Sequence, residues 1–233
     1  MQLKILSWNI WINGHFDEVK FFLKNADADI IGLQEVQADD PKMETIGFLT
    51  ELGYEHVFAS VPKIGDPKKG ERNVNDGPAV FSRHGILNSE TYTLSKTDSR
   101  CAVRADVQIG DKTLHVFSAH LLHTHQKQSD VQDEQVESLL RLLPHERTIL
   151  MGDFNAIPES SVIQKMGSTL TNTDPSFKPT WSAYPEGCSE CLPQSMDIRL
   201  DYIFTTTDLE THSPEVGDSK GSDHLPISVM VEV

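Results

Sequence analysis

The sequence T-I-L-M-G-D-F-N-A-I, residues 148–157, carries an apolar run that stops at Gly152 and is followed by Asp153 and Asn155. If residues 149–154 form a strand, alternate residues share a face, so Asp153 and Asn155 point the same way, about 7 Å apart. A carboxylate that holds a proton or metal, beside an amide that steadies a charged oxygen, suits phosphate chemistry. A turn is the competing interpretation, because Gly, Asp and Asn all favour turns.

Other polar residues also stand at the ends of apolar runs. Ends of up-strands and starts of down-strands share one rim of a mixed or antiparallel sheet, so these side chains can converge there. Asn9, Glu35, His120, Asp153 and Asn155 end such runs, Asp201 comes early in its run, and Asp223 and His224 just precede theirs. Neighbours on a straight strand point apart. Asp223 and His224 therefore reach one site only if their segment is a loop.

The acidic and amide residues of this rim are hard oxygen donors. Glu35, Asp153, Asp223 and either Asn9 or Asn155 suit Mg²⁺ or Mn²⁺ better than zinc. We therefore expect one of these two ions as the cofactor.

The histidines of the rim titrate near neutral pH and can move protons or bind a phosphate oxygen. Asp201 could bond to a histidine and fix its tautomer, as a triad acid does. No Cys or Ser stands where a covalent nucleophile would be obvious. These residue types indicate that activated water attacks phosphorus while a metal ion neutralises charge.

The composition limits the class of protein. The 233 residues, 38% of them hydrophobic, fit one domain over residues 1–233. The net charge of −15 argues against a protein that coats long nucleic acids, because phosphate contacts need many Lys and Arg. No apolar run is long enough to span a bilayer, and the first residues lack the apolar core of a secretory signal. We expect a cytoplasmic monomer without stable membrane insertion.

The cysteines allow a second kind of chemistry. Cys188 and Cys191 have C-x-x-C spacing, which raises zinc or redox chemistry, but Cys101 is too far along the sequence to complete a zinc site. We interpret the pair as loop cysteines, free or oxidised. His123 and His125 resemble metal ligands, but since oxygen ligands are expected here, we interpret them as loop residues.

Periodicity predicts the elements that must position the rim. Strands are predicted over residues 4–10, 29–36, 55–60, 78–83, 86–94, 102–109, 113–122, 149–154, 198–205 and 225–233. Helices are predicted from residue 15 to 24, from Asp40-Pro41 to Gly53, from residue 129 to 143 with Ser129 and Gln132 as a capping box, and from residue 159 to 166. Strands outnumber helices and many are joined by short turns. This favours an α+β domain with largely antiparallel pairing and helices outside.

Two stretches have no regular pattern. The polar segment Val61–Gly77 is either a substrate-facing segment or a plain surface excursion. The region from Thr171 to Pro193 contains Trp181, which we interpret as a substrate contact, because an aromatic residue in an irregular loop has fewer structural explanations.

Six short motifs resemble the metal-dependent endonuclease/exonuclease/phosphatase (DNase I-like) superfamily. S-W-N-I (7–10), L-Q-E-V (33–36), S-A-H-L (118–121), G-D-F-N-A (152–156), L-D-Y-I-F (200–204) and S-D-H-L-P (222–226) occur in the family's order. Each motif alone is weak, but six in order over nearly the whole chain are specific. The resemblance implies a four-layer α/β/β/α sandwich: two packed, mixed but mostly antiparallel sheets with outer helices.

The resemblance also implies a role for each rim residue. Glu35 is the expected main metal ligand with Asn9 beside it, and Asp223 assists at the metal. Asp153 positions or deprotonates the attacking water, and Asn155 holds the scissile phosphate. His224, oriented by Asp201, contacts the phosphate. His120 matches a histidine of the DNase I-like and phosphatase-like members, whereas abasic-site endonucleases have a tyrosine there. Arg100 or Arg104 matches a substrate-contacting arginine; we favour Arg100, because Arg104 has an outward strand position to explain it.

Three functions follow from these expectations. The first is a Mg²⁺- or Mn²⁺-dependent phosphodiesterase, such as a nuclease, acting on nucleic acid or a nucleotide-derived diester. The second is a phosphomonoesterase or lipid phosphodiesterase of the inositol-phosphate phosphatase or sphingomyelinase type. The third, an inactive binding module, conflicts with the complete motif set. Because the chain is acidic and lacks an obvious basic groove, we expect its activity to depend weakly on salt.

Overall fold

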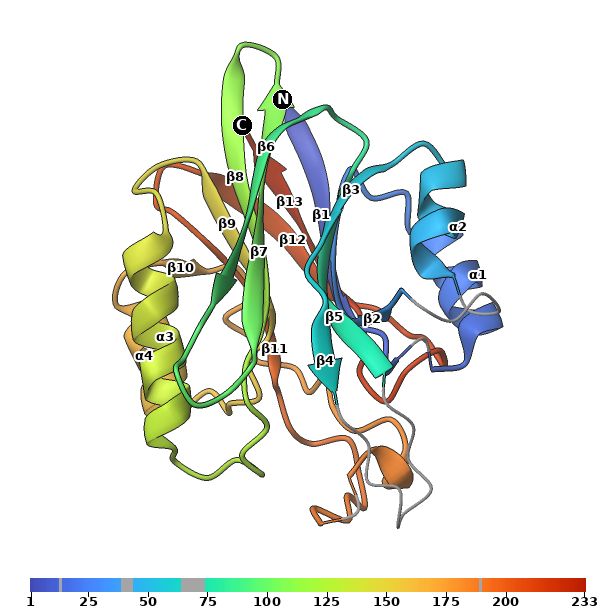
Figure 1. Ribbon diagram of the computed structural model, residues 1–233, viewed down its shortest axis with the longest axis vertical. Helices are drawn as coiled ribbons and strands as arrows, with labels where there is room; N and C mark the ends of the chain where they lie inside the picture. Colours follow the sequence, from blue (N-terminus) through green and yellow to red (C-terminus); the bar gives the residue numbers. More distant parts are fainter. Residues whose placement is uncertain (13, 39–43, 64–73, 189) are drawn as a thin grey trace.

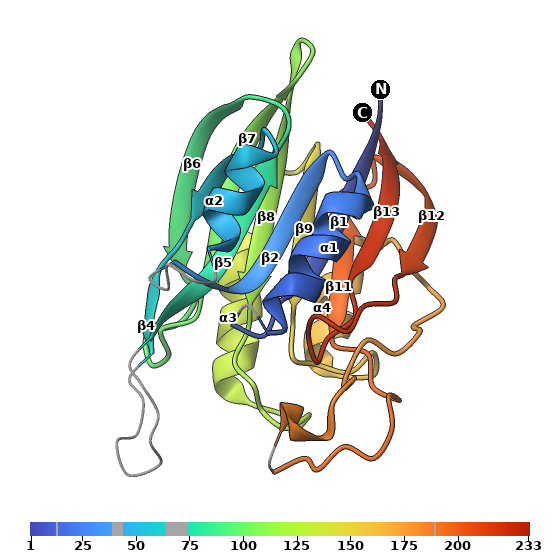
Figure 2. The same ribbon diagram turned by 90° about the vertical axis from the view of Figure 1, so that its right-hand side faces the viewer.

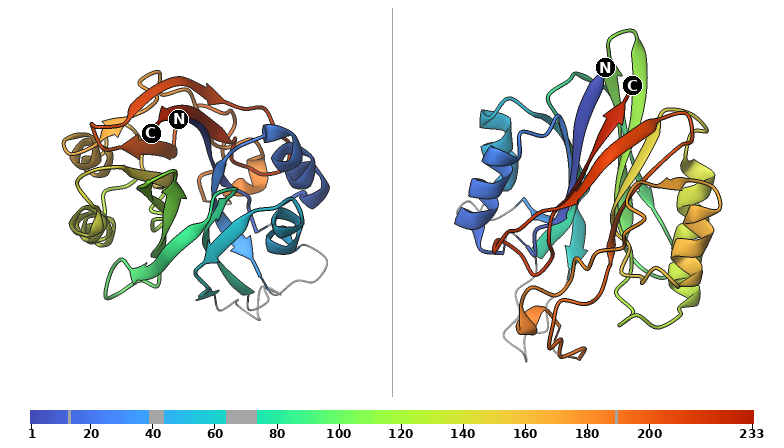
Figure 3. Two further views of the ribbon diagram at one scale, coloured as in Figure 1. Left: turned by 90° about the horizontal axis from the view of Figure 1, so that it is seen from above. Right: turned by 180° about the vertical axis from the view of Figure 1, so that it is seen from behind.

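Two β-sheets pack face to face, and helices cover both outer surfaces (Figure 1). The computed structural model describes residues 1–12, 14–38, 44–63, 74–188 and 190–233. One outer face carries α1 (Phe16–Ala26) and α2 (Thr45–Glu51), and the other carries α3 (Asp130–Leu142) and α4 (Ser161–Gly167), as the view from above shows (Figure 3). The predicted α/β/β/α sandwich is confirmed.

The first sheet has seven strands within the described residues, in the order β12-β13-β1-β2-β5-β3, with β4 also paired to β5. Only β1 and β2 run parallel among its described pairs. Figure 2 shows α1 and α2 lying over this sheet. Its strands are β1 (Gln2–Asn9), β2 (Ile30–Gln37), β3 (Glu55–Phe58), β4 (Val61–Lys63), β5 (Val74–Ser82), β12 (Glu210–Val216) and β13 (Ile227–Glu232).

The second sheet has six strands within the described residues, in the order β10-β11-β9-β8-β7-β6. Its central pair, β8 and β9, is parallel, and its other described pairs are antiparallel. Its strands are β6 (Ile86–Thr93), β7 (Cys101–Ile109), β8 (Lys112–His120), β9 (Thr148–Asp153), β10 (Thr171–Asn172) and β11 (Asp201–Thr205).

Strand alternation builds three apolar layers from the two sheets. In β1, Ile5 packs between the sheets, whereas Leu6 and Trp8 pack in the layer beneath α1. In β8, Val116 faces the other sheet, and Phe117 joins the layer beneath α3 and α4. Both faces of each central strand are therefore buried, which explains their nearly continuous apolar sequences.

Several predicted boundaries differ from the structure. The short strands β4 and β10 and the edge strand β12 had no apolar pattern; the side chains of β12 are mostly exposed, so its sequence is polar. β11 begins at Asp201 rather than residue 198. The predicted helix start at Asp40-Pro41 lies outside the described residues, and α2 begins at Thr45.

The predicted capping box of α3 is wrong. Ser129 occupies the N-cap position, but its side chain makes no capping hydrogen bond. Gln132 instead donates from Nε2 to the backbone carbonyls of Leu122, Phe154 and Asn155 at 3.0–3.2 Å. Gln132 therefore ties together the two segments that follow β8 and β9.

The polar segment Val61–Gly77 is described only at its two ends. These ends pair as β4 and β5, with Val61 opposite Asp76 and Lys63 opposite Val74. Residues 64–73, which the substrate-facing interpretation concerned most, lie outside the described residues. No helix in the described ranges is long and apolar enough to cross a bilayer.

Candidate active site

Asp153 lies at the centre of one end of the second sheet. The strand register pairs His120 of β8 with Asp153 of β9, and Asp153 with Asp201 of β11. Asp153 is 1% exposed, and its Oδ2 accepts a hydrogen bond from Asn9 at 3.0 Å. The same oxygen lies 3.4 Å from His120 Nε2 and 3.7 Å from His224 Nε2. Burial opposes ionisation, but the charge of His224 and the hydrogen bond from His120 outweigh it and hold the pKa of Asp153 well below its usual range.

Asp201 orients the imidazole ring of His224 through a hydrogen bond at Nδ1. The Nδ1 atom of His224 lies 2.9 Å from Oδ2 of Asp201, and this oxygen also accepts a hydrogen bond from Thr180 at 2.6 Å. Burial favours the neutral ring, but the negative charges of Asp201, Asp153 and Asp223 outweigh it and raise the pKa of His224 well above the ordinary value. His224 is therefore cationic at neutral pH, with Nε2 directed toward Asp153.

Asp223 and His224 line the same cleft because their segment is not a regular strand. His224 makes an isolated bridge with Trp181, and β13 begins only at Ile227, as the sequence argument required. Burial raises the pKa of Asp223 to about 6, and the nearby carboxylate of Glu35 adds to this effect against the opposing charge of His224. Two acidic groups therefore lie close enough to repel each other in the cleft.

Trp181 holds Asp223 in place. Its indole Nε1 donates to Asp223 Oδ2 at 3.1 Å, and the side chain is only 2% exposed. Trp181 lies outside the named strands, as the sequence indicated, and it is buried. The contact shown is with Asp223, and a substrate contact through the edge of the ring stays a prediction.

Glu35 reaches the cleft through an irregularity in β2. The register between β2 and β5 shifts between Leu33 and Val36, and Glu35 adopts a positive φ of 57°. Such a conformation is costly for a residue with a side chain and is concentrated at functional sites. It brings Glu35 Oε1 to 3.5 Å from Asn9 Nδ2 and 3.9 Å from His120 Nε2.

The amide of Asn9 is turned opposite to the orientation that a metal ligand needs. Its Oδ1 accepts a hydrogen bond from the backbone N–H of Trp11 at 3.0 Å, so its Nδ2 faces Asp153 and Glu35. A metal ion binds the oxygen of an amide, not its nitrogen. In this structure Asn9 therefore holds the two carboxylates in position, and its role as a metal ligand stays a prediction.

Asn155 lies just beyond β9, in a left-handed conformation with φ 49°, rather than on the straight strand that the sequence suggested. Its backbone N–H donates to Asp153 Oδ1 at 2.8 Å, and its side-chain Nδ2 donates to the carbonyl of Leu121 at 3.1 Å. Its Oδ1 accepts from His123 Nδ1 at 2.7 Å. Asn155 lines the cleft, and contact with a scissile phosphate stays a prediction.

Arg100, rather than Arg104, reaches the cleft. Its Nη1 lies 2.6 Å from Nδ1 of His120. Because arginine can only donate, His120 carries its proton on Nε2, directed toward Asp153 and Glu35. Arg104 instead donates to Asp106 at 2.7 Å, on the outward side of β7. Of the two arginines that the sequence offered, the structure therefore favours Arg100.

The structure brings the H-x-H and C-x-x-C pairs together, which the sequence interpretation missed. His123, His125, Cys188 and Cys191 offer ligand atoms that all lie within 4.8 Å of one another. Their spacings were visible in the sequence, but neither pair alone makes a four-ligand site. The signal in the sequence was the presence of both pairs, since together they supply the four ligands of a metal site.

Most of the residues described above in this section surround a cleft of about 480 Å³. Glu35, His120, Asp153, Asn155, Asp223 and His224 form its polar wall. Asp201 and Asn9 lie buried behind this wall. Arg100 is the one Lys or Arg among the described residues that line the cleft, and a smaller hollow of about 270 Å³ continues past it. Six of the eight predicted rim residues therefore line the cleft, and Asn9 and Asp201 contact it through Asp153 and His224.

Glu35 and Asp223 are the residues that best fit a divalent cation. Both are carboxylates on the cleft wall, and the charge of Glu35 adds to burial in raising the pKa of Asp223. A hard cation with oxygen ligands would relieve the repulsion between the two charges. Asp153, Asp201 and His224 also offer atoms within 4.8 Å of one another. In this second set, His224 Nδ1 already bonds to Asp201 Oδ2 at 2.9 Å.

Comparisons with known proteins agree with this geometry. Residues 6–224 match the Endonuclease/Exonuclease/phosphatase family, whereas no curated protein matches the chain. An endonuclease/exonuclease/phosphatase from Beutenbergia cavernae has a TM-score of 0.81 at 20% identity, covering 100% of this chain and 72% of that one. The human Nocturnin catalytic domain with bound sulfate has a TM-score of 0.71 at 21% identity, covering 99% and 94%.

A third similar structure is ANGEL2, a 2',3'-cyclic phosphatase in complex with adenosine-2',3'-vanadate. It has a TM-score of 0.74 at 17% identity, covering 99% of this chain and 95% of that one. Identities this low show a shared fold. The match to the family spans the rim from Asn9 to His224, and the chain belongs to the endonuclease/exonuclease/phosphatase family.

Proposed function

We propose that this chain hydrolyses a phosphodiester, in a nucleic acid or derived from a nucleotide, by in-line attack of water with Mg²⁺ or Mn²⁺ as cofactor. Membership of the family implies phosphate-ester hydrolysis. The observation that carries the proposal is the buried carboxylate of Asp153, whose Oδ2 lies 3.4 Å from His120 Nε2 and 3.7 Å from His224 Nε2. The same cleft holds Glu35 and Asp223 as candidate metal ligands.

Asp153 is best suited to orient the attacking water. A carboxylate with a pKa well below its usual range is a weak proton acceptor, so it accepts a hydrogen bond long before it accepts a proton. A Mg²⁺ or Mn²⁺ ion held by Glu35 and Asp223 would neutralise phosphate charge and make nearby water more acidic. As the oxygen–phosphorus bond forms, the water becomes a stronger acid and its proton passes to Asp153. In the same in-line step the bond from phosphorus to the leaving oxygen breaks on the opposite side, and the leaving oxygen takes a proton from solvent.

The two histidines supply donors for the phosphate oxygens. His224 presents a charged Nε2–H into the cleft, and Asp201 keeps the ring in this orientation. His120 presents its own Nε2–H on the other side of Asp153. Both donors are fixed before substrate arrives, which favours the transition state because no reorganisation is needed.

The charge of the cleft favours a short substrate. Glu186 and Glu190 line the cleft beside its catalytic carboxylates, and Arg100 is the one described Lys or Arg on its wall. A protein that follows a long nucleic acid needs many basic contacts. We therefore propose a nucleotide-sized diester, or the end of a nucleic acid, and a weak dependence of kcat/KM on salt.

The alternative substrate is a phosphomonoester or a lipid head group. The same donors could bind a terminal phosphate, and a cleft of about 480 Å³ accommodates an inositol phosphate as well as a nucleotide. An inactive binding module is disfavoured. The residue types that the proposed catalysis needs are present, and their side chains are also oriented for it, since Asp153 lies between the Nε2 atoms of His120 and His224.

The test is a panel of DNA, RNA, nucleotide diesters, phosphotyrosyl-DNA, inositol phosphates and sphingomyelin, each with Mg²⁺, Mn²⁺ or chelator. We expect turnover of a short diester that the chelator abolishes, and retention of the fold but not of turnover in Glu35→Ala. Glu51→Ala, on the surface of α2, is the matched control. Preference for a monoester or lipid would select the alternative. Metal-independent turnover, or full activity of Glu35→Ala, would refute the metal assignment.

A further inference from the structure

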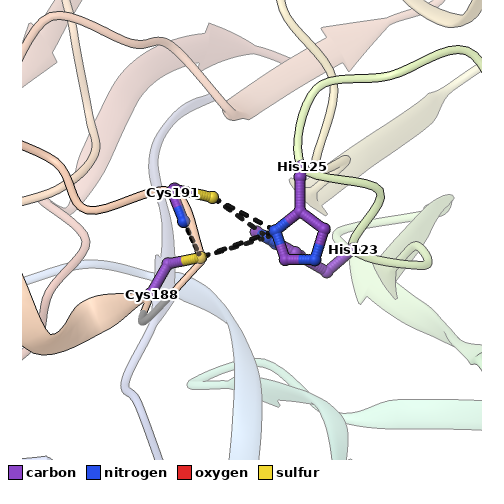
Figure 4. Close-up of side chains that lie close together, drawn as sticks. All are labelled: His123, His125, Cys188 and Cys191. Atoms are coloured by element: carbon purple, nitrogen blue, oxygen red, sulfur yellow. Dashed lines mark hydrogen bonds between the residues drawn. The ribbon is translucent and has the colours of Figure 1, made fainter.

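Two segments far apart in the sequence bring two histidines and two cysteines to one point beside the cleft. His123 and His125 follow β8, and Cys188 and Cys191 follow the short helix η2 (Pro185–Gly187). Their side chains point toward one another (Figure 4). The Sγ atom of Cys188 lies 3.9 Å from His123 Nε2 and 3.5 Å from His125 Nδ1. The Sγ atom of Cys191 lies 3.8 Å and 3.2 Å from the same two nitrogens.

These distances are those of ligands around one tetrahedral ion. Bonds of about 2.3 Å to sulfur and 2.0–2.1 Å to nitrogen place tetrahedral ligand atoms about 3.3–3.8 Å apart. The four sulfur–nitrogen distances span 3.2–3.9 Å, and the two nitrogens lie 3.1 Å apart. The set is therefore slightly irregular but already close to the size that a zinc ion requires.

The surroundings turn the correct nitrogen of each histidine inward. His123 donates from Nδ1 to Oδ1 of Asn155 at 2.7 Å, which leaves Nε2 for the cluster. His125 has Nε2 3.1 Å from a carboxylate oxygen of Glu190, which leaves Nδ1 for the cluster. In zinc sites the outer nitrogen of a ligand histidine commonly donates to a carboxylate or carbonyl oxygen. Both rings have this arrangement.

One backbone hydrogen bond joins the two cysteines, because the N–H of Cys191 donates to Sγ of Cys188 at 3.0 Å. When both rings are neutral and each outer nitrogen carries the proton, the two inward nitrogens face each other at 3.1 Å with their lone pairs. Only weak S–H donors would then relieve that contact.

We propose that His123, His125, Cys188 and Cys191 bind a structural Zn²⁺ ion. Two imidazoles and two thiolates make a complete tetrahedral set, which leaves no open position for water or substrate. Each cysteine releases its thiol proton to solvent on binding, and no electron is transferred. The soft sulfur ligands separate this site from the oxygen-lined cation site at Glu35 and Asp223.

The zinc ion would fix one wall of the cleft. His123, His125, Cys188 and Glu190 all line it, and His123 is bonded directly to Asn155 beside Asp153. Zinc would therefore position this wall by joining the segment after β8 to the segment after η2. Through His123, it would also hold the side-chain amide of Asn155 in place.

The first experiment measures metal in the full chain, produced without a histidine tag and dialysed free of loose metal. We expect about one Zn²⁺ per chain by elemental mass spectrometry. Co²⁺ added to zinc-depleted protein should give the visible absorption of a tetrahedral site with sulfur ligands. A zinc content near zero after exposure to excess Zn²⁺, with no tetrahedral cobalt spectrum, would overturn the proposal.

Matched variants locate the ion. Cys188→Ser with Cys191→Ser should lose the zinc and the cobalt spectrum, whereas Cys101→Ala, a cysteine buried in the core between the sheets, should keep both. Glu35→Ala should also keep its zinc, so failure of the catalytic assignment is distinguishable from failure of this one. Zinc retained by the double cysteine variant would show binding elsewhere and refute the site. An intact mass showing a Cys188–Cys191 disulfide under reducing purification would also refute it.

Discussion

Asp201 Oδ2 lies 2.9 Å from His224 Nδ1, at a depth where neither side chain is open to solvent. The other nitrogen of the same ring faces Asp153 at 3.7 Å. One histidine is thus held between two carboxylates, one that orients it and one that takes part in the proposed reaction. This arrangement lets the protein keep a cationic donor in the cleft at neutral pH.

Asp201→Asn should therefore change the pH profile. The raised pKa of His224 depends first on the charge of Asp201, so its loss lowers that pKa and the imidazolium disappears at a lower pH. We expect the alkaline limb of kcat/KM to move toward acid and kcat at alkaline pH to fall by about 100-fold. Asp197→Asn, at an exposed position, is the control. An alkaline limb at its original pH in Asp201→Asn would contradict this role.

Arg100→Gln should weaken substrate binding. Arg100 lines the cleft and bonds to His120, so its loss removes a charged donor, and we expect KM to rise about tenfold. Arg104→Gln is a close control, since Arg104 also contacts a histidine, His115, but away from the cleft. It should lower stability and leave KM unchanged. Equal KM changes in the two variants would show that the assignment of Arg100 is wrong.

Gly152→Ala should separate the two strands that carry His120 and Asp153. A Cβ at Gly152 would lie 1.9 Å from the backbone oxygen of Ala119 on β8, and the residue has φ 155°. We expect the free energy of unfolding to fall by at least about 2 kcal/mol, measured by urea denaturation, with loss of activity. Gly85→Ala meets no atom within 4 Å and should be nearly neutral. Equal free energies of unfolding for Gly152→Ala and Gly85→Ala would contradict the close approach of β9 to β8 at Gly152.

Asp174→Asn should destabilise the protein in a pH-dependent way. Asp174 bonds Arg199 Nη1 at 2.7 Å, and the two side chains are 9% and 2% exposed. Burial opposes ionisation, but hydrogen bonds from Ser176 and Arg199 lower the pKa of Asp174 below its ordinary value. Its charged form therefore stabilises the fold above the unfolded pKa of about 3.9, and this contribution is lost as pH falls through the lower folded value.

At neutral pH the variant leaves Arg199 buried and unpaired, so we expect it to lose about 3 kcal/mol in urea denaturation. The difference from the original protein should shrink as the pH falls below about 4, because Asp174 itself then becomes protonated. Asp17→Asn, at an exposed position on α1, should show no difference at either pH. A gap that widens in acid would mean that the sign of the pKa shift is wrong.

The sequence predicted the layers and the rim by two routes: the resemblance of the six motifs implied the four layers, and the polar residues at the ends of apolar runs indicated the rim. Apolar strands buried on both faces leave clear runs, and polar side chains at their ends have no other place to gather. The parallel pairing of β8 with β9 then sets His120 beside Asp153 without any loop geometry. The apolar runs depend on strand periodicity, which a sequence displays directly, whereas the parallel pairing of β8 with β9 was not predicted.

The local sequence pattern could not predict how a side-chain amide is oriented or which residues far apart in the sequence come into contact. Asn9 has the residue type of a metal ligand, and only the backbone N–H of Trp11 decides which way its amide turns. The edge strand β12 is polar because it is exposed, so it lacks the alternation of a core strand. His125 and Cys188 are 63 residues apart in the sequence, and neither short motif indicates that their side chains are in contact.

The proposed catalytic groups and the cleft walls come from different parts of the fold. His120, Asp153 and Asp201 sit on adjacent strand ends, where a register shift of one residue would scatter them. The walls at Trp11, Trp181 and Glu186 come from connecting segments. Connecting segments tolerate exchange far better than paired strands do. Specificity could therefore be re-engineered by grafting loops from other members of the family, while the hydrolytic chemistry stays with the scaffold.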